Sequence, residues 1–199
     1  MTLEEIKTMR VELIKKGKRL PNFAQLKYKH PRNEKERQKY CDVDDVDASG
    51  AILEHDVEVL YTLVKKYNPK TIIEVGSWFG TSAMVMDKAS NGAAIYTCDK
   101  NNVYVYESET VKFFNKGSGN FFSKMIKANV RADFMFIDGQ IVEDIAKLPK
   151  CMAKNCVILF HDYEKPQKGW RNVEALKKIS SFKLLVDKEN KTALVEMKK

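Results

Sequence analysis

Acidic and imidazole side chains recur directly within or after short apolar runs of this chain, and they are the residues whose types could do chemistry. They are Glu74, Asp99, Asp138 and the pair His161-Asp162. Carboxylates accept hydrogen bonds from hydroxyl groups and hold hard divalent cations, and a histidine can transfer protons near neutral pH. Any one of these residues is simply explained as a helix cap or a turn. Because the set follows successive runs, we expect its members to share one site.

The stretch EVGSWFGTS, residues 74–82, combines a carboxylate with two glycines at the end of the first run. A buried carboxylate is unfavourable unless a partner offsets its desolvation, and glycines at a strand end allow a sharp turn or a close approach to a ligand. The stretch is neither a G-x-G-x-x-G dinucleotide motif nor a phosphate-binding loop, which argues against both kinds of site. The aromatic pair Trp78-Phe79 could wall a ligand, although packing in the core is the simpler expectation.

Alternating strands and helices must position these residues. Apolar runs predict strands at 71–76, 93–98, 111–115, 132–138, 156–161, 182–187 and 192–197. Helical spacing predicts helices near 3–17, 51–67, 80–90, 101–109, 118–129, 141–153 and 168–180. Continuously apolar strands separated by helices indicate a parallel sheet covered on both faces, and the last two strands are close enough for an antiparallel edge hairpin. The predicted fold is therefore a doubly wound α/β fold with a mostly parallel seven-stranded sheet, in which ligands bind outside the carboxyl ends of the strands.

Length and composition indicate one main domain with an N-terminal extension. The chain has 199 residues, of which 44% are hydrophobic and 31% charged, as in globular proteins. We expect residues 51–199 to form the main domain and residues 1–50 a helical and irregular extension, which could cover the site or form contacts in a homodimer. No apolar stretch is long enough to span a membrane and the N-terminus has no apolar signal core, so we expect a cytoplasmic protein.

The net charge of +8 is unevenly distributed, because residues 7–40 hold 12 Lys and Arg residues against 3 Glu. Such a segment could attract nucleic acid, an anionic surface or an acidic substrate, but solvated lysine-rich helix faces are the simpler explanation. The four cysteines and three histidines do not have the spacing of zinc ligands. Cys98 and Cys156 lie in apolar runs and are most simply small core residues.

The motifs, taken in order, resemble those of class I S-adenosylmethionine-dependent methyltransferases over about residues 50–180. EVGSWFGTS resembles the E/D-x-G-x-x-x-G-x-S loop of that family. ADFMFIDGQ and VILFHDYEKPQKGWRNVEAL resemble two blocks of its small O-methyltransferases, the subgroup that includes catechol-type and macrocin- or cephalosporin-associated enzymes. The resemblance implies a Rossmann-like methyltransferase fold, S-adenosylmethionine as the cofactor, and methyl transfer to a hydroxyl on a small or medium-sized acceptor.

The resemblance also implies which residues bind the cofactor. An acidic residue at the end of the second strand, here Asp99, can accept both hydroxyls of a ribose. Glu74 would receive the cationic end of the cofactor directly or through water, and Gly117-Ser118 would meet the adenine. The complete implied set is Glu74, Gly76, Ser77, Gly80, Ser82, Asp99, Lys100, Gly117, Ser118 and Asp138.

Members of this subgroup often bind a divalent cation at the carboxylates that follow the fourth and fifth strands. Asp138 and Asp162 are the implied metal ligands and catalytic residues. His161, the third catalytic candidate, would be a metal ligand, a general base or a residue that orients Asp162. Mg²⁺ prefers oxygen ligands and would lower the pKa of an acceptor hydroxyl.

One departure from the pattern keeps two alternatives open. Many relatives have a histidine or lysine shortly after the strand-four aspartate, where this chain has Gln140, Ile141 and Val142. A catalytically inactive protein that only binds the cofactor is therefore one alternative. The other is a nucleic-acid methyltransferase that uses the basic segment 7–40, although no N-P-P-Y-like motif supports it.

Overall fold

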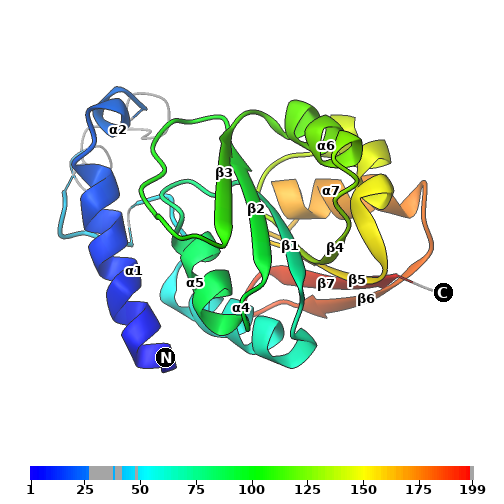
Figure 1. The fold of residues 1–199 in the computed structure, drawn as a ribbon, viewed down its shortest axis with the longest axis horizontal. Coiled ribbons are helices and arrows are strands. Elements are labelled where there is room, and N and C mark those ends of the chain that lie inside the picture. Colours follow the sequence, from blue (N-terminus) through cyan, green and yellow to red (C-terminus); the bar gives the residue numbers. More distant parts are fainter. Residues whose placement is uncertain (27–37, 39–41, 48, 198–199) are drawn as a thin grey trace.

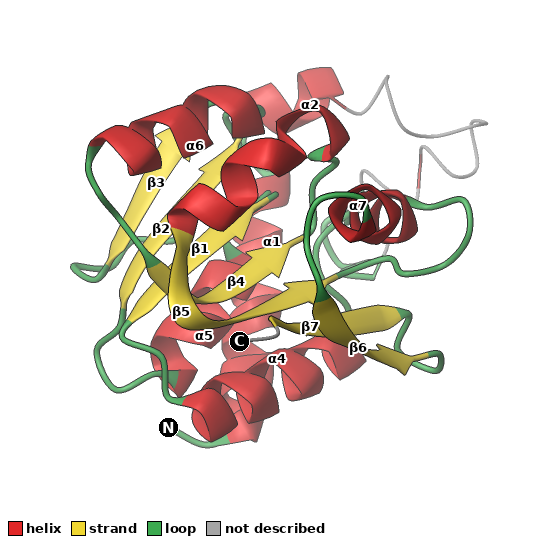
Figure 2. Ribbon diagram, turned by 90° about the vertical axis from the view of Figure 1, so that its right-hand side faces the viewer, coloured by secondary structure: helices red, strands yellow, loops and turns green. Residues whose placement is uncertain are grey.

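The computed structural model describes residues 1–26, 38, 42–47 and 49–197. Seven strands form one sheet in the order β3-β2-β1-β4-β5-β7-β6 (Figures 1 and 2). The first five are parallel, and the last two form a hairpin in which β7 runs antiparallel to β5. The strands are β1 (Thr71–Val75), β2 (Ala94–Asp99), β3 (Val111–Asn115), β4 (Ala132–Ile137), β5 (Met152–Phe160), β6 (Phe182–Asp187) and β7 (Thr192–Met197). The predicted seven-stranded sheet with its antiparallel C-terminal hairpin is confirmed.

The strand order creates a switch point between β1 and β4. From β1 the chain proceeds outward to β2 and β3, then returns to β4 on the other side of β1. The connections that leave β1 and β4 therefore diverge at the carboxyl edge of the sheet, where ligands of open α/β folds bind.

Helices cover both faces of the sheet, as Figure 2 shows. One face carries α1 (Leu3–Lys18), α4 (Glu54–Tyr67) and α5 (Thr81–Ala89). The other carries α6 (Ser118–Lys127), the 3₁₀ helix η2 (Val142–Cys151) and α7 (Lys168–Lys177). Among the described residues, no helix is long and apolar enough to cross a membrane.

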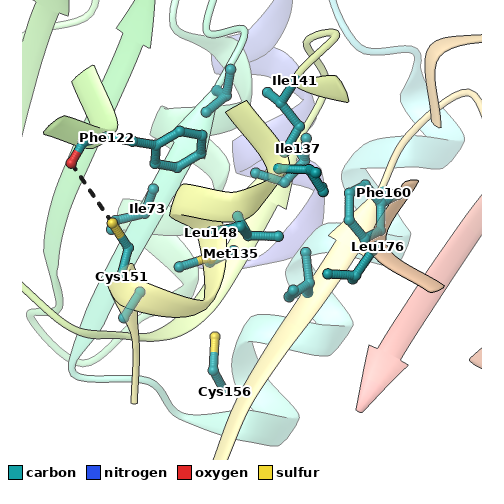
Figure 3. Packing of buried hydrophobic residues seen from close by; sticks show 14 of the residues in the cluster. Ile73, Phe122, Met135, Ile137, Ile141, Leu148, Cys151, Cys156, Phe160 and Leu176 are labelled. Carbon is teal, nitrogen blue, oxygen red and sulfur yellow. Dashed lines mark hydrogen bonds between the residues drawn. The ribbon is translucent and has the colours of Figure 1, made fainter. Parts of the chain in front are cut away.

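Successive strand residues point to opposite faces, which explains why the buried parts of the central strands are apolar at consecutive positions. Ile72 packs with the α1, α4 and α5 helices, whereas the next residue, Ile73, packs with α6 and η2. Figure 3 shows the hydrophobic cluster on the face covered by α6, η2 and α7. In it, strand residues such as Ile73 pack against Leu148 of η2 and Leu176 of α7. The prediction that Cys98 and Cys156 are core residues is confirmed, because each side chain is about 1% exposed.

The predicted helix at 101–109 is wrong, because this segment is a loop. Its alternating valines and tyrosines pack against different parts of the protein. Val103 is fully buried, and Tyr104 stacks on Phe113 with ring centroids 4.2 Å apart. The backbone N–H of Val105 donates to the Phe79 carbonyl at 3.1 Å instead of to a helical partner. Tertiary packing thus overrides the local helical pattern.

The N-terminal segment packs on the main domain through α1, which lies beside α5 (Figure 1). A Cβ on Gly17 would lie 2.2 Å from the Phe79 ring, so only glycine permits this contact. The stretch 18–50 contains the short helix α2 (Pro21–Leu26), where we expected irregular structure. The predicted irregular extension otherwise includes residues 27–37, 39–41 and 48, which lie outside the described residues.

Part of the positive charge of the basic segment 7–40 is internal. Arg10 is 2% exposed, and its Nε donates to the Ile52 carbonyl at 2.7 Å. Lys18 is 6% exposed, and its Nζ donates to the carbonyl oxygens of Asp42 and Asp45 at 2.7 and 2.6 Å. These two cations therefore anchor the N-terminal segment to the fold and are not displayed to a nucleic acid.

Candidate active site at the carboxyl edge of the sheet

A cleft of about 690 Å³ opens where β1, β2, β3 and β4 end. Its walls come from the loops after these strands, from Gly50 in the N-terminal segment, and from Lys168 at the start of α7. This volume and this position at the switch point are typical of a small-molecule site.

The cleft brings together much of the predicted cofactor-binding set. Six of those residues line it: Gly76, Asp99, Lys100, Gly117, Ser118 and Asp138. The other four are buried outside its lining: Glu74, Ser77, Gly80 and Ser82. The structure therefore places the first group at the cleft surface and the second group behind it, and the role of each residue towards a cofactor stays a prediction.

The two glycines of the first loop are required by close backbone approaches. Gly76 has φ +96°, and a Cβ there would lie 2.9 Å from the carbonyl carbon of Asp138. Gly80 has φ +91°, and its Cβ would lie 2.6 Å from the Tyr104 ring. The first loop is thereby pressed against the β4 loop on one side and against the 101–109 segment on the other.

Trp78 and Phe79 have different environments, although they are adjacent in sequence. Phe79 is fully buried in the cluster with Ile14 and Phe23, as the core-packing interpretation expects. Trp78 lines the cleft, and its indole N–H donates to the Ser49 carbonyl at 2.9 Å. One of the two aromatics therefore walls the cleft.

Asp99 is held in place by backbone amides and retains capacity to bind a ligand. Its Oδ2 accepts from the Trp78 N–H at 3.0 Å, and its Oδ1 accepts from the Asn101 N–H at 2.8 Å. Each carboxylate oxygen can accept a further hydrogen bond. The cleft wall therefore presents two fixed acceptors side by side, which fits a vicinal diol such as that of a ribose.

Glu74 is a fully buried carboxyl with an incomplete set of partners. Burial raises its pKa to about 7, against the lowering effect of the Ser82 and Thr97 hydroxyls. Thr97 donates to Oε2, whereas Oε1 has no hydrogen-bond partner among the described residues. The buried Ser77 Oγ also lacks a partner there. Two buried polar atoms, one at the end of β1 and one in the turn that follows, are therefore left without a partner behind the cleft surface.

The strand-four and strand-five residues form a cluster of alternating charge. His161 Nδ1 lies 2.7 Å from Asp138 Oδ1, and the Lys168 ammonium lies 2.8 Å from the same oxygen. Lys168 also contacts Asp162 Oδ2 at 3.1 Å. Burial alone would raise the pKa of Asp138, but His161 and Lys168 more than offset this and lower it.

His161 lies between two carboxylates. Its second ring nitrogen, Nε2, is 3.1 Å from Oδ1 of Asp56, which is 4% exposed in the first turn of α4. Burial alone would lower the pKa of His161, but the carboxylates of Asp138 and Asp56 raise it to about 10. The ring is thus hydrogen-bonded to Asp138 through Nδ1, and its Nε2 lies close to the buried Asp56 carboxylate.

The three residues that were predicted to bind a divalent cation lie close together, but a lysine already pairs with the two aspartates. Ligand atoms of Asp138, His161 and Asp162 lie within 4.8 Å of one another, a spacing that a cation could bridge. Lys168, however, joins the two aspartates, and both nitrogens of His161 face carboxylates. The residues in this arrangement do not fit a divalent cation, which would have to displace the Lys168 ammonium from both aspartates.

Three residues that shape the site were not singled out from the sequence: Asp56, Lys168 and Asn172. The fully buried Asn172 accepts from the Ile141 N–H at 3.0 Å and donates to the Gly139 carbonyl at 2.8 Å, which fixes the loop after β4. Lys168 and Asn172 lie within the block that resembles O-methyltransferases, and this was the available signal for them. Asp56 resembled an ordinary helix-capping residue, and it does accept from the Leu53 N–H at 2.8 Å.

No protein-family model matches this chain, and no curated protein matches it. Several solved structures are similar to this chain, and each similarity covers most of both chains. A methyltransferase from Geobacter sulfurreducens has a TM-score of 0.63 at 12% identity, covering 88% of this chain and 93% of the other. The SAH-bound methyltransferase PaMTH1 from Podospora anserina has a TM-score of 0.59 at 14% identity, covering 87% and 92%. The O-methyltransferase TomG from Streptomyces achromogenes, in complex with SAM, has a TM-score of 0.54 at 12% identity, covering 89% and 96%. With its strand order and antiparallel C-terminal hairpin, the chain therefore has the class I methyltransferase fold that its motifs predict.

Proposed function

We propose that this chain is an S-adenosylmethionine-dependent methyltransferase that acts on a hydroxyl oxygen of a small or medium-sized acceptor. The observation that carries the proposal is the cleft at the switch point, with the fixed Asp99 carboxylate on one side and Asp138 on the other. Support also comes from the structural matches, which include proteins described as O-methyltransferases with SAM or SAH bound.

The cofactor would be held along the carboxyl ends of β1, β2 and β3. Asp99 would accept the ribose hydroxyls, and Glu74 with Ser77 would satisfy the amino-acid end. Gly117 would leave room for the adenine, since a Cβ there would meet no atom within 4 Å. When bound, the cofactor supplies an electrophilic methyl group on a sulfonium.

The protein's contribution to transfer would be positioning and electrostatics. The acceptor would enter beside Asp138 and Lys168, which line the same cleft. An acceptor hydroxyl held there would give up its proton to water, and its oxygen would be the nucleophile toward the methyl group that the cofactor would supply. Metal assistance is not part of this proposal, because Lys168 and His161 already neutralise the carboxylates that would bind the metal.

Calorimetric titration of the folded protein with S-adenosylmethionine tests the proposal. We expect saturable binding, weakened about tenfold or more by Asp99→Asn, because one charge-assisted hydrogen bond is worth about 1.5–3 kcal/mol. Asp44→Asn is the matched control, since this aspartate pairs with Lys15 and its side chain is 83% exposed. Absence of binding by a folded protein would refute the proposed function.

One observation favours a second candidate, a protein that binds the cofactor without transferring the methyl group. Gln140 lines the cleft where related sequences carry a basic residue, and His161 is engaged by two carboxylates. This candidate predicts bound S-adenosylmethionine and no release of S-adenosylhomocysteine with any member of a broad panel of phenolic and alcoholic acceptors. Release with a single acceptor would exclude it.

A further inference from the structure

Lys168 occupies an unusual position for a lysine. It is the first residue of α7, where the positive end of the helix dipole disfavours a cation unless nearby carboxylates offset the effect. Asp138 and Asp162 supply that offset at 2.8 and 3.1 Å. The side chain nevertheless remains 32% exposed and lines the cleft. The ammonium is therefore fixed by the cluster and still accessible to a ligand.

The start of α7 is built to bring Lys168 to this place. A Cβ on the next residue, Gly169, would lie 2.0 Å from the His161 carbonyl oxygen, so only glycine allows the helix to begin against the end of β5. Asn172, one turn later, ties the helix to the loop after β4 through Ile141 and Gly139. The position of the lysine is thus fixed by the close approach at Gly169, by the hydrogen bonds of the Asn172 side chain and by its own ion pairs.

The Lys168 ammonium bridges the two carboxylates that were predicted to bind a metal. Its Nζ lies 2.8 Å from Asp138 Oδ1 and 3.1 Å from Asp162 Oδ2. A cation shared by these two aspartates would need the space between them, and that space is taken by the ammonium.

We propose that the Lys168 ammonium takes the place of a divalent cation in this cleft and is the cationic group that meets the acceptor oxygen. An ammonium has three N–H donors, and the two aspartates use two of them, so one remains for a ligand in the cleft. A single N–H contacts one oxygen, whereas a metal ion can be chelated by two. The acceptor consequently needs one hydroxyl and not a vicinal pair. The statement about the acceptor rests on the proposed function, whereas the exclusion of a metal does not.

Titration with Mn²⁺, followed by the loss of the free-ion signal in electron paramagnetic resonance, tests the inference with the full chain. We expect no saturable site in the wild type, and one saturable site in Lys168→Met that binds Mn²⁺ at least tenfold more tightly than any residual non-saturable binding of the wild type over the same concentration range. The double variant Lys168→Met/Asp162→Asn should lose this site again. Lys165→Met is the matched control, because this exposed lysine lies three residues before Lys168 in the turn that leads into α7 and contacts the Trp170 ring. It should behave as the wild type does.

Saturable Mn²⁺ binding by the wild type that is abolished by Asp162→Asn would overturn the inference, whatever the folding of the lysine variant. A folded Lys168→Met that gains no site would also overturn it. Lys168→Arg provides a second check, because it keeps the positive charge and should bind no Mn²⁺. Titration of the same wild-type sample with S-adenosylmethionine separates the two proposals: failure to bind the cofactor refutes the proposed function and leaves the metal result standing.

Discussion

Glu74 makes the stability of the ligand-free protein depend on pH in the direction opposite to that of an ion-paired carboxylate. Its side chain is fully buried, and burial raises its pKa from 4.5 to about 7. A raised folded-state pKa means that the native state binds the proton more tightly than the unfolded chain does. The stabilisation is therefore fully present below pH 4.5 and is lost as the pH rises through about 7.

The size of the effect follows from the two pKa values. At about 1.4 kcal/mol per pH unit, the difference between 4.5 and about 7 corresponds to roughly 3 kcal/mol. Glu74→Gln keeps the size and removes the ionisation. We expect the variant to match the wild type near pH 4.5 and to exceed its unfolding free energy by about 3 kcal/mol at pH 8.

Urea denaturation at a series of pH values from 4.5 to 8, followed by tryptophan fluorescence, measures this difference. Glu196→Gln is a control of opposite sign, because a hydrogen bond from Tyr67 lowers the pKa of Glu196. Its carboxylate stabilises the fold at higher pH, and this contribution is lost as the pH falls through the lowered pKa. Parallel stability curves for the wild type and Glu74→Gln would show that the buried carboxyl does not titrate as its surroundings require.

Three further perturbations probe the cleft. Gly76→Ala should destabilise the fold by about 2 kcal/mol more than Gly92→Ala in urea denaturation. Both glycines have positive φ, but only a Cβ at Gly76 would meet backbone, at 2.9 Å from the carbonyl carbon of Asp138. Equal losses of stability would contradict this close approach. Asn172→Ala should cost about 2–4 kcal/mol in the same assay, since it leaves the Ile141 N–H and the Gly139 carbonyl without their partner, whereas the exposed Asn91→Ala should cost less than about 1 kcal/mol. Binding of S-adenosylmethionine at pH 6 should release protons, because the ligand's ammonium group would lower the raised pKa of Glu74. Calorimetry in two buffers of different ionisation enthalpy measures the number of protons released. The same release in Glu74→Gln would show that the protons come from another group.

The central strands could be predicted because most of their residues are apolar on both faces of the sheet. Ile72 and Ile73, for example, pack in the clusters on opposite faces, so consecutive positions are apolar, whereas a surface helix is apolar along one side only. The segment 101–109 could not be predicted in the same way. Its helical pattern comes from residues that belong to different packing sites, such as Val103 in the core and Tyr104 against Phe113, and the sequence does not state which partner each will meet.

The site was predictable where the chain itself brings a residue to the strand ends. Asp99 is the last residue of β2 and Asp138 directly follows β4, so the parallel sheet alone brings both to the cleft. Lys168 and Asp56 arrive from helices that dock onto opposite faces, and their meeting at Asp138 and His161 depends on helix placement. That placement depends in turn on contacts such as the one between Gly169 and the His161 carbonyl. Such contacts cannot be inferred from the spacing of residues in the sequence.

The position of Trp78 gives the cleft a natural optical reporter. Its indole lines the cleft, while the other tryptophan of the chain, Trp170, lies in α7 beneath the Lys165 ammonium and outside the cleft lining. A purine that stacked on Trp78 would quench one emitter and leave the second as an internal reference. Occupancy of the cleft can therefore be followed by intrinsic fluorescence without a label, with Trp78→Phe as the silent variant.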